Sequence, residues 1–168
     1  MTKFVPLEWQ ISPWRDKSLM LLMDGGSGSG KSRLAAEKVH AYCLKYAGAT
    51  GVVGRKDRAS ASKSVVPMLR YTVQSGTNWG TYKSSDQVFE YNNGSLIYVV
   101  GLKDKGQLEA LKSIRGKHGD PDIVWFEEAN GLSLTDHETI MTRLRGSVAN
   151  WQQLIYTTNP DSPEHWIN

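Results

Sequence analysis

The sequence is short of cysteine, of long apolar runs and of net charge, and each shortage narrows the possible functions. Cys43 is the only cysteine among 168 residues, which excludes a disulfide framework and a thiolate metal cluster. We expect Cys43 to be a small buried side chain. The apolar runs fall far short of the ~20 residues of a membrane-spanning helix, and the first residues lack the apolar core of a signal peptide. These features fit a protein of the reducing cytoplasm without a membrane partner.

The net charge of +3 permits a nucleic-acid partner but does not argue for one. Any such contact would depend on local basic clusters, of which residues 55–58 with Lys63 form one and residues 112–117 another. Either cluster alone is more typical of a solvated face. A length of 168 residues and an apolar content of 39% suit a single domain with a real core. We therefore expect one domain over residues 1–168, with an N-terminal arm over about residues 1–17.

One stretch fits the phosphate-loop pattern G-x-x-x-x-G-K-[ST] without a mismatch. An apolar run at residues 19–24 precedes it and predicts a buried strand, while residues 33–46 predict a helix. A flexible Gly/Ser linker is the alternative, but linkers are rarely framed by a strand and a helix. The eight residues are Gly25, Gly26, Ser27, Gly28, Ser29, Gly30, Lys31 and Ser32.

The chemistry of this stretch suits a nucleoside triphosphate. Glycines allow the backbone to wrap tightly so that successive N–H groups point inward, and the following helix adds its positive N-terminal end. Lys31 would bridge the β- and γ-phosphates, and the Ser32 hydroxyl would bind Mg²⁺. A nucleoside triphosphate and Mg²⁺ are therefore the expected ligands.

A second chemical element lies at residues 122–129, where a short apolar strand ends in Glu127 and Glu128. In an open parallel sheet, ligands bind beyond the carboxyl ends of the strands. We therefore expect Glu127 to hold Mg²⁺ and Glu128 to orient and deprotonate the attacking water. The alternative is a helix N-terminus that favours acidic residues for electrostatic reasons.

Two further side chains are candidates for contact with the nucleotide. Asn159 follows a predicted strand at residues 152–156 and could hydrogen-bond the γ-phosphate or the attacking water. Taken alone, Asn159 would be better explained by an ordinary Asn-Pro turn, but beside the phosphate loop and the two acids a contact with the γ-phosphate is the better interpretation. Gln10 lies in the N-terminal arm, where its amide could read the adenine edge. A packed arm without contact to the base is an equally good interpretation of Gln10.

These patterns predict an α/β three-layer P-loop fold with a mostly parallel central sheet. Asn93-Gly94 between two β-prone runs indicates a β-hairpin insertion over residues 87–100. Pro67 predicts a break in a helix over residues 59–73. The remaining elements are a strand at 51–54, a loop at 74–85, and helices at 106–113 and 135–145.

Taken together, the motifs resemble the ATPase domain of the large terminase subunit, the DNA-packaging motor of tailed bacteriophages. The resemblance covers essentially the whole chain. It implies that Glu127 is the Walker B acid, that Glu128 is the catalytic glutamate, and that residues 157–159 form a motif coupling hydrolysis to movement. The matching segments are Gly25–Ser32, Lys112–Gly116, Ile123–Ala129, Arg143–Arg145, Thr157–Pro160 and His165–Trp166.

The chain departs from that family in three places. Glu127 stands where an aspartate is common, and Ser27 stands where many relatives carry an arginine. The resemblance therefore implies that an arginine comes from elsewhere: Arg115, acting on a neighbouring subunit, is the first choice, followed by Arg55 and Arg143. The chain ends soon after the coupling motif, so we expect no nuclease domain and no nuclease activity in it.

The resemblance implies Mg²⁺-dependent ATP hydrolysis that powers translocation of double-stranded DNA into a viral procapsid. The implied partners are the portal protein, the small terminase subunit and further copies of the chain in a ring. The implied location is the host bacterial cytoplasm, at the procapsid portal. A helicase-like ATPase, a nucleotide kinase and a nucleotide-binding fragment with negligible turnover are the alternatives.

Overall fold

A mostly parallel β-sheet forms the centre of the molecule in a computed structural model that describes residues 3–115 and 119–168. Gly116, which ends the matching segment Lys112–Gly116, and Lys117, which ends the basic cluster at residues 112–117, lie outside the described residues. The strand order is β1-β7-β6-β2-β5-β4-β3. The strands are β1 (Met20–Asp24), β2 (Thr50–Gly54), β3 (Gly80–Lys83), β4 (Val88–Tyr91), β5 (Leu96–Val100), β6 (Ile123–Glu127) and β7 (Gln153–Thr158).

Five neighbouring strands, from β1 through β7, β6 and β2 to β5, run parallel. The predicted hairpin is confirmed, since β4 pairs antiparallel with β5. β3 extends it with a further antiparallel pairing, from Gly80 opposite Tyr91 to Lys83 opposite Val88. β3 lies within the segment predicted as a loop, because a four-residue strand of Gly, Thr, Tyr and Lys carries little periodic signal. The sheet therefore combines a parallel core with an antiparallel extension.

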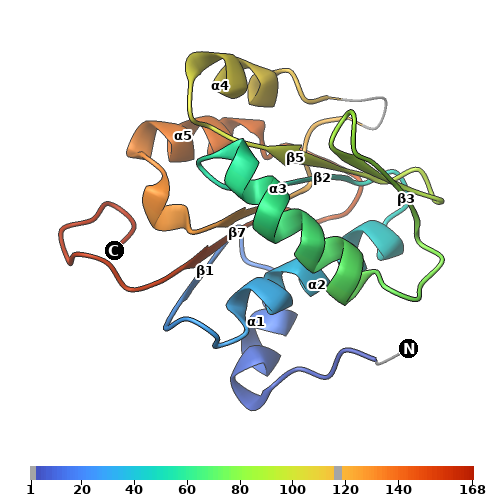
Figure 1. Cartoon of the computed structure of the whole chain (residues 1–168), viewed down its shortest axis with the longest axis horizontal. Coiled ribbons are helices and arrows are strands. Elements are labelled where there is room, and N and C mark those ends of the chain that lie inside the picture. Colours follow the sequence, from blue (N-terminus) through green and yellow to red (C-terminus); the bar gives the residue numbers. More distant parts are fainter. Residues whose placement is uncertain (1–2, 116–118) are drawn as a thin grey trace.

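Helices cover both faces of this sheet, which gives the predicted three layers (Figure 1). One face carries α2 and α3, and the other carries α4 and α5. The N-terminal arm contributes the short α1. The α-helices are α1 (Ile11–Arg15), α2 (Lys31–Lys45), α3 (Arg58–Pro67), α4 (Lys105–Lys112) and α5 (Leu134–Arg143).

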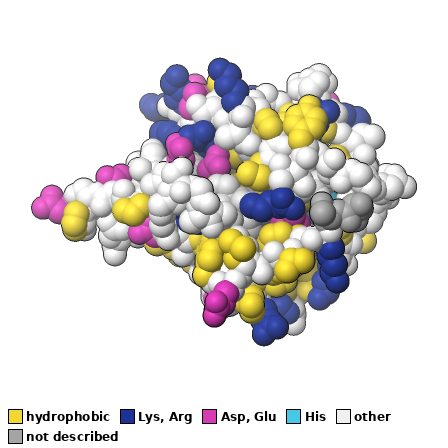
Figure 2. All heavy atoms as spheres, turned by 60° about the horizontal axis from the view of Figure 1, so that its bottom comes forward, with side chains coloured by type: hydrophobic (Ala, Val, Ile, Leu, Met, Phe, Trp, Pro, Cys, Tyr) yellow, Lys and Arg dark blue, Asp and Glu magenta, His cyan; other side chains and the backbone are white. Residues whose placement is uncertain are grey.

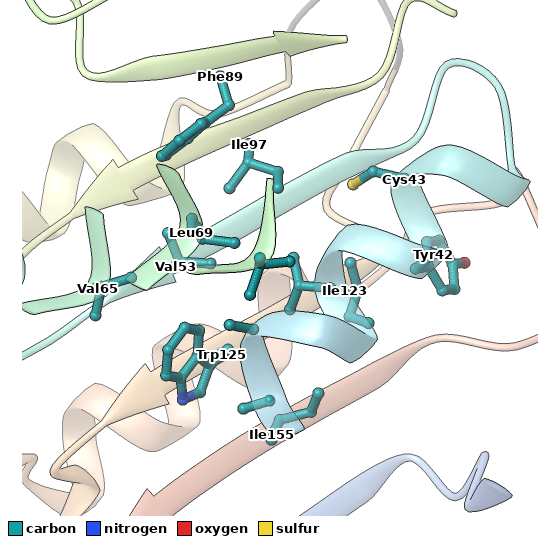
Figure 3. Close-up of a cluster of buried hydrophobic side chains, with 14 of the residues drawn as sticks. Tyr42, Cys43, Val53, Val65, Leu69, Phe89, Ile97, Ile123, Trp125 and Ile155 are labelled. Atoms are coloured by element: carbon teal, nitrogen blue, oxygen red, sulfur yellow. The ribbon is translucent and has the colours of Figure 1, made fainter. Parts of the chain in front are cut away.

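Alternation along the strands decides which core each side chain joins. In β6, Trp125 belongs to the core beneath α2 and α3, whereas Val124 and Phe126 belong to the core beneath α4 and α5. Figure 3 shows Trp125 and Ile155 pointing toward the helix that carries Cys43. Cys43 is fully buried, as predicted. Because both faces of the parallel strands are covered, their sequences read as near-continuous apolar runs.

The strand before the phosphate loop is an exception, and its predicted burial is wrong. β1 pairs only with β7 and lies at the edge of the described sheet. Met20 and Leu22 are 42% and 41% exposed, although Met23 is buried in the core beneath α2. An apolar run predicts a strand but does not say how many neighbours the strand has.

Local signals explain where the helices begin and end. α3 ends at Pro67, where the chain changes to a π-helical segment, Met68–Val73, closed by a bond from Gln74 N to Leu69 O of 2.8 Å. The chain thus changes from α-helix to π-helix at Pro67, where the sequence predicts a break, and the proline has no N–H to donate to the preceding turn. α5 begins with a capping box in which Ser133 and Asp136 exchange side-chain-to-backbone bonds.

The surface suits the mild net charge. On the face shown in Figure 2, Lys and Arg side chains lie in separate groups, with hydrophobic side chains between them. No helix among the described residues is long and apolar enough to cross a membrane. Most of the exposed large hydrophobic side chains among the described residues lie early in the chain, at Val5, Leu7, Trp9, Ile11, Leu19, Met20 and Leu22; the others are Leu44, Tyr71 and Leu134.

A buried histidine makes stability depend on pH. His40 in α2 is 6% exposed and its Nδ1 lies 2.8 Å from the Tyr91 hydroxyl; burial lowers its pKa to about 4. Between pH 6.5 and 4 the unfolded chain takes up a proton that the folded chain excludes, so acidification through this range favours unfolding. Acidification from pH 6.5 to 4 should lower the free energy of unfolding of the wild type by roughly 1–3 kcal/mol more than that of His40→Asn.

Urea denaturation at several pH values measures this difference directly. The wild type and His40→Asn share all their other titratable groups, so the difference between the two pH profiles gives the contribution of His40. Parallel profiles from pH 4 to 6.5 would mean that His40 is already accessible to protons in the folded chain.

Candidate functional site

The phosphate-loop pattern connects the end of β1 to the start of α2. Gly28 and Gly30 adopt left-handed backbone angles, with φ of 76° and 86°, which glycine adopts without strain. A cavity of about 350 Å³ opens at the loop, on the edge of the sheet where the parallel strands end. Its lining comprises Ser27, Gly28, Ser29, Gly30, Lys31, Ser32, Arg33, Met68, Glu127, Glu128, Thr157, Thr158 and Asn159.

Lys31 is the first residue of α2, and its ammonium group is held inside the loop. Nζ donates to the carbonyl oxygens of Gly25 at 2.6 Å and Gly26 at 2.8 Å, and to Ser29 Oγ at 3.0 Å. The residue is only 7% exposed. A positive charge is thus fixed at the floor of the cavity, next to the N-terminal end of a fifteen-residue helix, and both favour an anion there.

Gln10 contacts the loop from behind instead of lining the cavity. It is 2% exposed, its Oε1 accepts from Leu7 N at 2.8 Å, and its Nε2 donates to Gly30 O at 3.0 Å. A Cβ added at Gly30 would lie 2.8 Å from Gln10 Nε2. In the structure this amide ties the N-terminal arm to the base of the phosphate loop.

The two acids at the end of β6, Glu127 and Glu128, both line the cavity but differ in backbone conformation. Glu127 is the last residue of β6 and pairs in register with Thr157 of β7. Its Oε2 is buried and finds no hydrogen-bond partner among the described residues. Glu128 follows in the left-handed region, with φ of 52°, which costs a side-chain-bearing residue about 1–2 kcal/mol. Backbone strain of this kind tends to cluster at functional sites.

Arg55 provides the counter-charge for both acids. It follows β2, whose last residue, Gly54, is in register with Phe126, so the arginine emerges beside the end of β6. One of its terminal nitrogens forms an ion pair with Glu128 Oε2, and the other lies 3.9 Å from Glu127 Oε2 and 3.3 Å from Ser64 Oγ. The sequence suggested Arg55 only as a second choice for an arginine near the phosphates. Nothing in the local pattern indicated that Arg55 would pair with Glu128.

Glu128 also borders a second cavity of about 240 Å³, so its carboxylate stands between two openings. Arg55 and Lys56 also line the second cavity. Lys56 Nζ is bonded to Asp136 Oδ2 of α5 at 2.7 Å. The segment after β2 is therefore tied both to Glu128 and to the start of α5.

The end of β7 completes the cavity wall. Thr157 Oγ1 accepts from the indole N–H of Trp125 at 3.0 Å, which fixes the end of β7 against β6. Thr158 Oγ1 donates to Asn159 O at 3.1 Å. Asn159 lines the cavity together with Lys31 and Glu128.

The other two candidate arginines lie away from the cavity lining. The Arg115 side chain is 72% exposed, and its Nε is 3.9 Å from Asp120 Oδ1. Arg143 is 5% exposed and pairs with the same carboxylate at 2.8 Å. Sequence reasoning missed Met68, which lines the cavity from the junction of α3 and the π-helical segment. The break at Pro67 is the only sequence signal beside it.

The donor set near the loop fits Mg²⁺ better than a metal that needs an all-protein cage. The described residues contain no group of three or more His, Cys, Asp or Glu side chains placed to hold a metal ion. Ser32 and Glu127 line the same cavity, and Glu127 offers a carboxylate oxygen that no described residue satisfies. Mg²⁺ is commonly bound by one or two protein ligands together with substrate phosphates and water.

Comparison with known proteins finds a matching family model and several similar solved structures. A family model described as "Phage terminase large subunit" matches residues 17–168. The large terminase of a thermophilic bacteriophage has a similar structure, with a TM-score of 0.76 and 16% identity over 95% of this chain and 39% of that one. The complex of that terminase with ADP gives 0.73 and 15%, over 92% and 37%. No curated protein matches the sequence.

A further similar structure is the bacteriophage Phi-29 viral genome packaging motor assembly. It has a TM-score of 0.58 and 14% identity, covering 96% of this chain and 49% of that one. The TM-scores show that these proteins share the fold of this chain. The chain spans about two fifths of the length of the thermophilic phage terminase, with 39% covered.

The backbone at Glu128 yields a prediction that does not depend on function. Glu128→Gly and Glu128→Ala both remove the carboxylate and its bond to Arg55, but only glycine adopts a φ of 52° without strain. We expect Glu128→Gly to exceed Glu128→Ala in free energy of unfolding by about 1 kcal/mol in urea denaturation.

The same two substitutions at Glu127 serve as the control, because that residue lies in a β-strand. There alanine should be the more stable of the two, by about 0.5–1 kcal/mol. An advantage of alanine at both positions would contradict the left-handed backbone at Glu128.

Proposed function

The chain belongs to the phage terminase large subunit family, and from this premise we propose that it hydrolyses ATP with Mg²⁺ to drive double-stranded DNA into a viral procapsid. The observation that carries the proposal is the convergence on one cavity of Lys31, a cation at the phosphate loop, and Glu128, a carboxylate on a strained backbone. A fold relative in complex with ADP supports nucleotide binding by this fold.

Each side chain then has a role that its position suits. Lys31 neutralises phosphate charge once its ammonium exchanges the Gly25 and Gly26 carbonyls for phosphate oxygens. Ser32 and Glu127 hold Mg²⁺, which offsets the charge that builds up on the phosphate oxygens during transfer. Asn159 hydrogen-bonds the γ-phosphate or the attacking water from the end of β7.

Glu128 is the general base that takes a proton from the attacking water. The Glu128 carboxylate oxygen that is bonded to Arg55 is not available to accept a hydrogen bond from the attacking water. Arg55 and the water therefore compete for the Glu128 carboxylate. Hydrolysis requires the carboxylate to turn from Arg55 toward the phosphate loop, a small rotation because Glu128 already borders both cavities.

The exposed Arg115 acts on the nucleotide of a neighbouring subunit. It does not line the cavity of its own chain, and its side chain is 72% exposed at the surface. Copies of the chain assemble as a ring with the portal protein and the small terminase subunit, in the host cytoplasm at the procapsid portal. Measuring ATPase activity of monomeric and oligomeric fractions, with and without double-stranded DNA, separates this function from a binding-only fragment. A phosphate-transfer assay with nucleoside monophosphates tests the nucleotide kinase.

Removing the base should separate binding from hydrolysis. We expect Glu128→Gln to bind ATP and to hydrolyse it at least ~100-fold more slowly, since general-base steps contribute about that factor. Lys31→Ala should instead lose tight ATP binding in a calorimetric titration. Glu109→Gln, on the exposed face of α4, is the matched control. Wild-type turnover in Glu128→Gln would assign the base to another residue.

Gln10 allows a test between adenine recognition and packing of the arm. Because its amide is bonded to Leu7 and Gly30, Gln10→Ala should loosen the base of the phosphate loop and weaken ATP and GTP binding by similar factors. Calorimetric titration of both nucleotides checks this expectation. A selective loss of ATP affinity, about 10-fold or more for a lost base-reading hydrogen bond, would show that the amide reads the base.

A further inference from the structure

Arg143, the last residue of α5, is buried although it carries a full charge. It is 5% exposed, and burying a guanidinium is costly unless a partner compensates. Its Nη2 donates to Asp120 Oδ1 at 2.8 Å and to the Ile114 carbonyl oxygen at 3.3 Å. These two partners lie on either side of Arg115 in the sequence. One guanidinium group therefore joins the two ends of the segment from which Arg115 projects.

Neighbouring contacts hold the downstream end of this segment in the same way. Gly146 N donates to Pro121 O at 2.8 Å, and Val148 N donates to Asp122 Oδ1 at 3.2 Å. A Cβ added at Gly146 would overlap the Asp122 carboxylate, so the two segments approach as closely as glycine allows. The chain after α5 is thus attached directly to the residues that lead into β6.

Asp120 lies within reach of two arginines, and the distances show which one it pairs with. Arg143 is 2.8 Å from its Oδ1, whereas Arg115 is 3.9 Å away and 72% exposed. An unpaired Asp120 would attract the nearer guanidinium available to it, which is that of Arg115. With Arg143 in place, the charge of Asp120 is already compensated and Arg115 stays extended at the surface.

We propose that Arg143 is a positioning residue, which fixes the base of the Arg115 segment and neutralises Asp120 so that Arg115 can reach a neighbouring subunit. The proposal rests on the proposed function, in which Arg115 acts in trans. The opposite end of the same helix is bonded to Lys56 through Asp136, next to the Arg55–Glu128 pair. α5 therefore holds the Arg115 segment at a fixed place relative to its own nucleotide cavity.

A mixing experiment tests the proposal, because it separates the subunit that supplies the arginine from the one that hydrolyses ATP. The donor carries Lys31→Ala and cannot use its own cavity, and the acceptor carries Arg115→Ala. Mixtures over a range of ratios should recover ATPase activity when donor Arg115 completes the acceptor's site. Arg143→Met is then added to the donor alone or to the acceptor alone.

In the donor, Arg143→Met should lower the recovered activity by about 10-fold or more, the scale expected when a catalytic group is displaced by about 1 Å. In the acceptor, the same change should cost far less, because that subunit's own arginine is not used. Arg143→Lys in the donor should retain part of the recovery, since a lysine keeps the charge near Asp120. Equal losses in donor and acceptor, or full recovery with the Arg143→Met donor, would overturn the proposal.

Two controls keep the outcome decisive. Arg143→Met leaves Asp120 without its partner, so a donor that also carries Asp120→Asn tests the case in which the single variant does not fold. That double variant should recover more activity than Arg143→Met alone, because no carboxylate remains to capture Arg115. If the mixture of Lys31→Ala and Arg115→Ala shows no recovery, Arg115 does not act in trans and Arg143 has no positioning role. Glu128→Gln still tests ATP hydrolysis independently of that result.

Discussion

The parallel pairing of β1, β7, β6 and β2 is the constraint on which the site depends. In this register Asp24 lies opposite Thr158, Glu127 opposite Thr157, and Gly54 opposite Phe126. The carboxyl ends of four strands that are distant in sequence therefore meet at one edge of the sheet. Since each strand end carries a different chemical group, a shift of one residue in any pairing would turn its side chains to the wrong face.

Charge balance at this edge sets the resting state of the site. Lys31 is held by its own loop, and Glu128 is held by Arg55, so the groups that would act on a triphosphate are paired internally. A γ-phosphate would draw Lys31 out of the loop, and the water beside it would offer Glu128 an alternative partner. Substrate binding and activation of the base would then be coupled through exchange of ion pairs, without movement of the sheet.

Local patterns predicted the parts of the fold and of the candidate site that are contiguous in sequence. The phosphate loop, the acids after β6 and the hairpin at Asn93-Gly94 each lie within a few residues, so their spacing carries the signal. The pairing of Arg55 with Glu128 depends on β2 lying beside β6, and the edge position of β1 depends on strand order. Neither feature produces a pattern in the local sequence. The burial of Arg143 likewise follows from the distant Asp120.

The central claim is that this cavity hydrolyses ATP with Glu128 as the base, released from Arg55. A crystal structure with Mg²⁺, ADP and aluminium fluoride, which mimics the transferring phosphoryl group and its attacking water, tests it most directly. We expect Lys31 to contact the phosphate oxygens, and Glu128 to lie within hydrogen-bond distance of the water and apart from Arg55. A mimic bound in the loop with Glu128 still paired to Arg55, and another residue contacting the water, would contradict it.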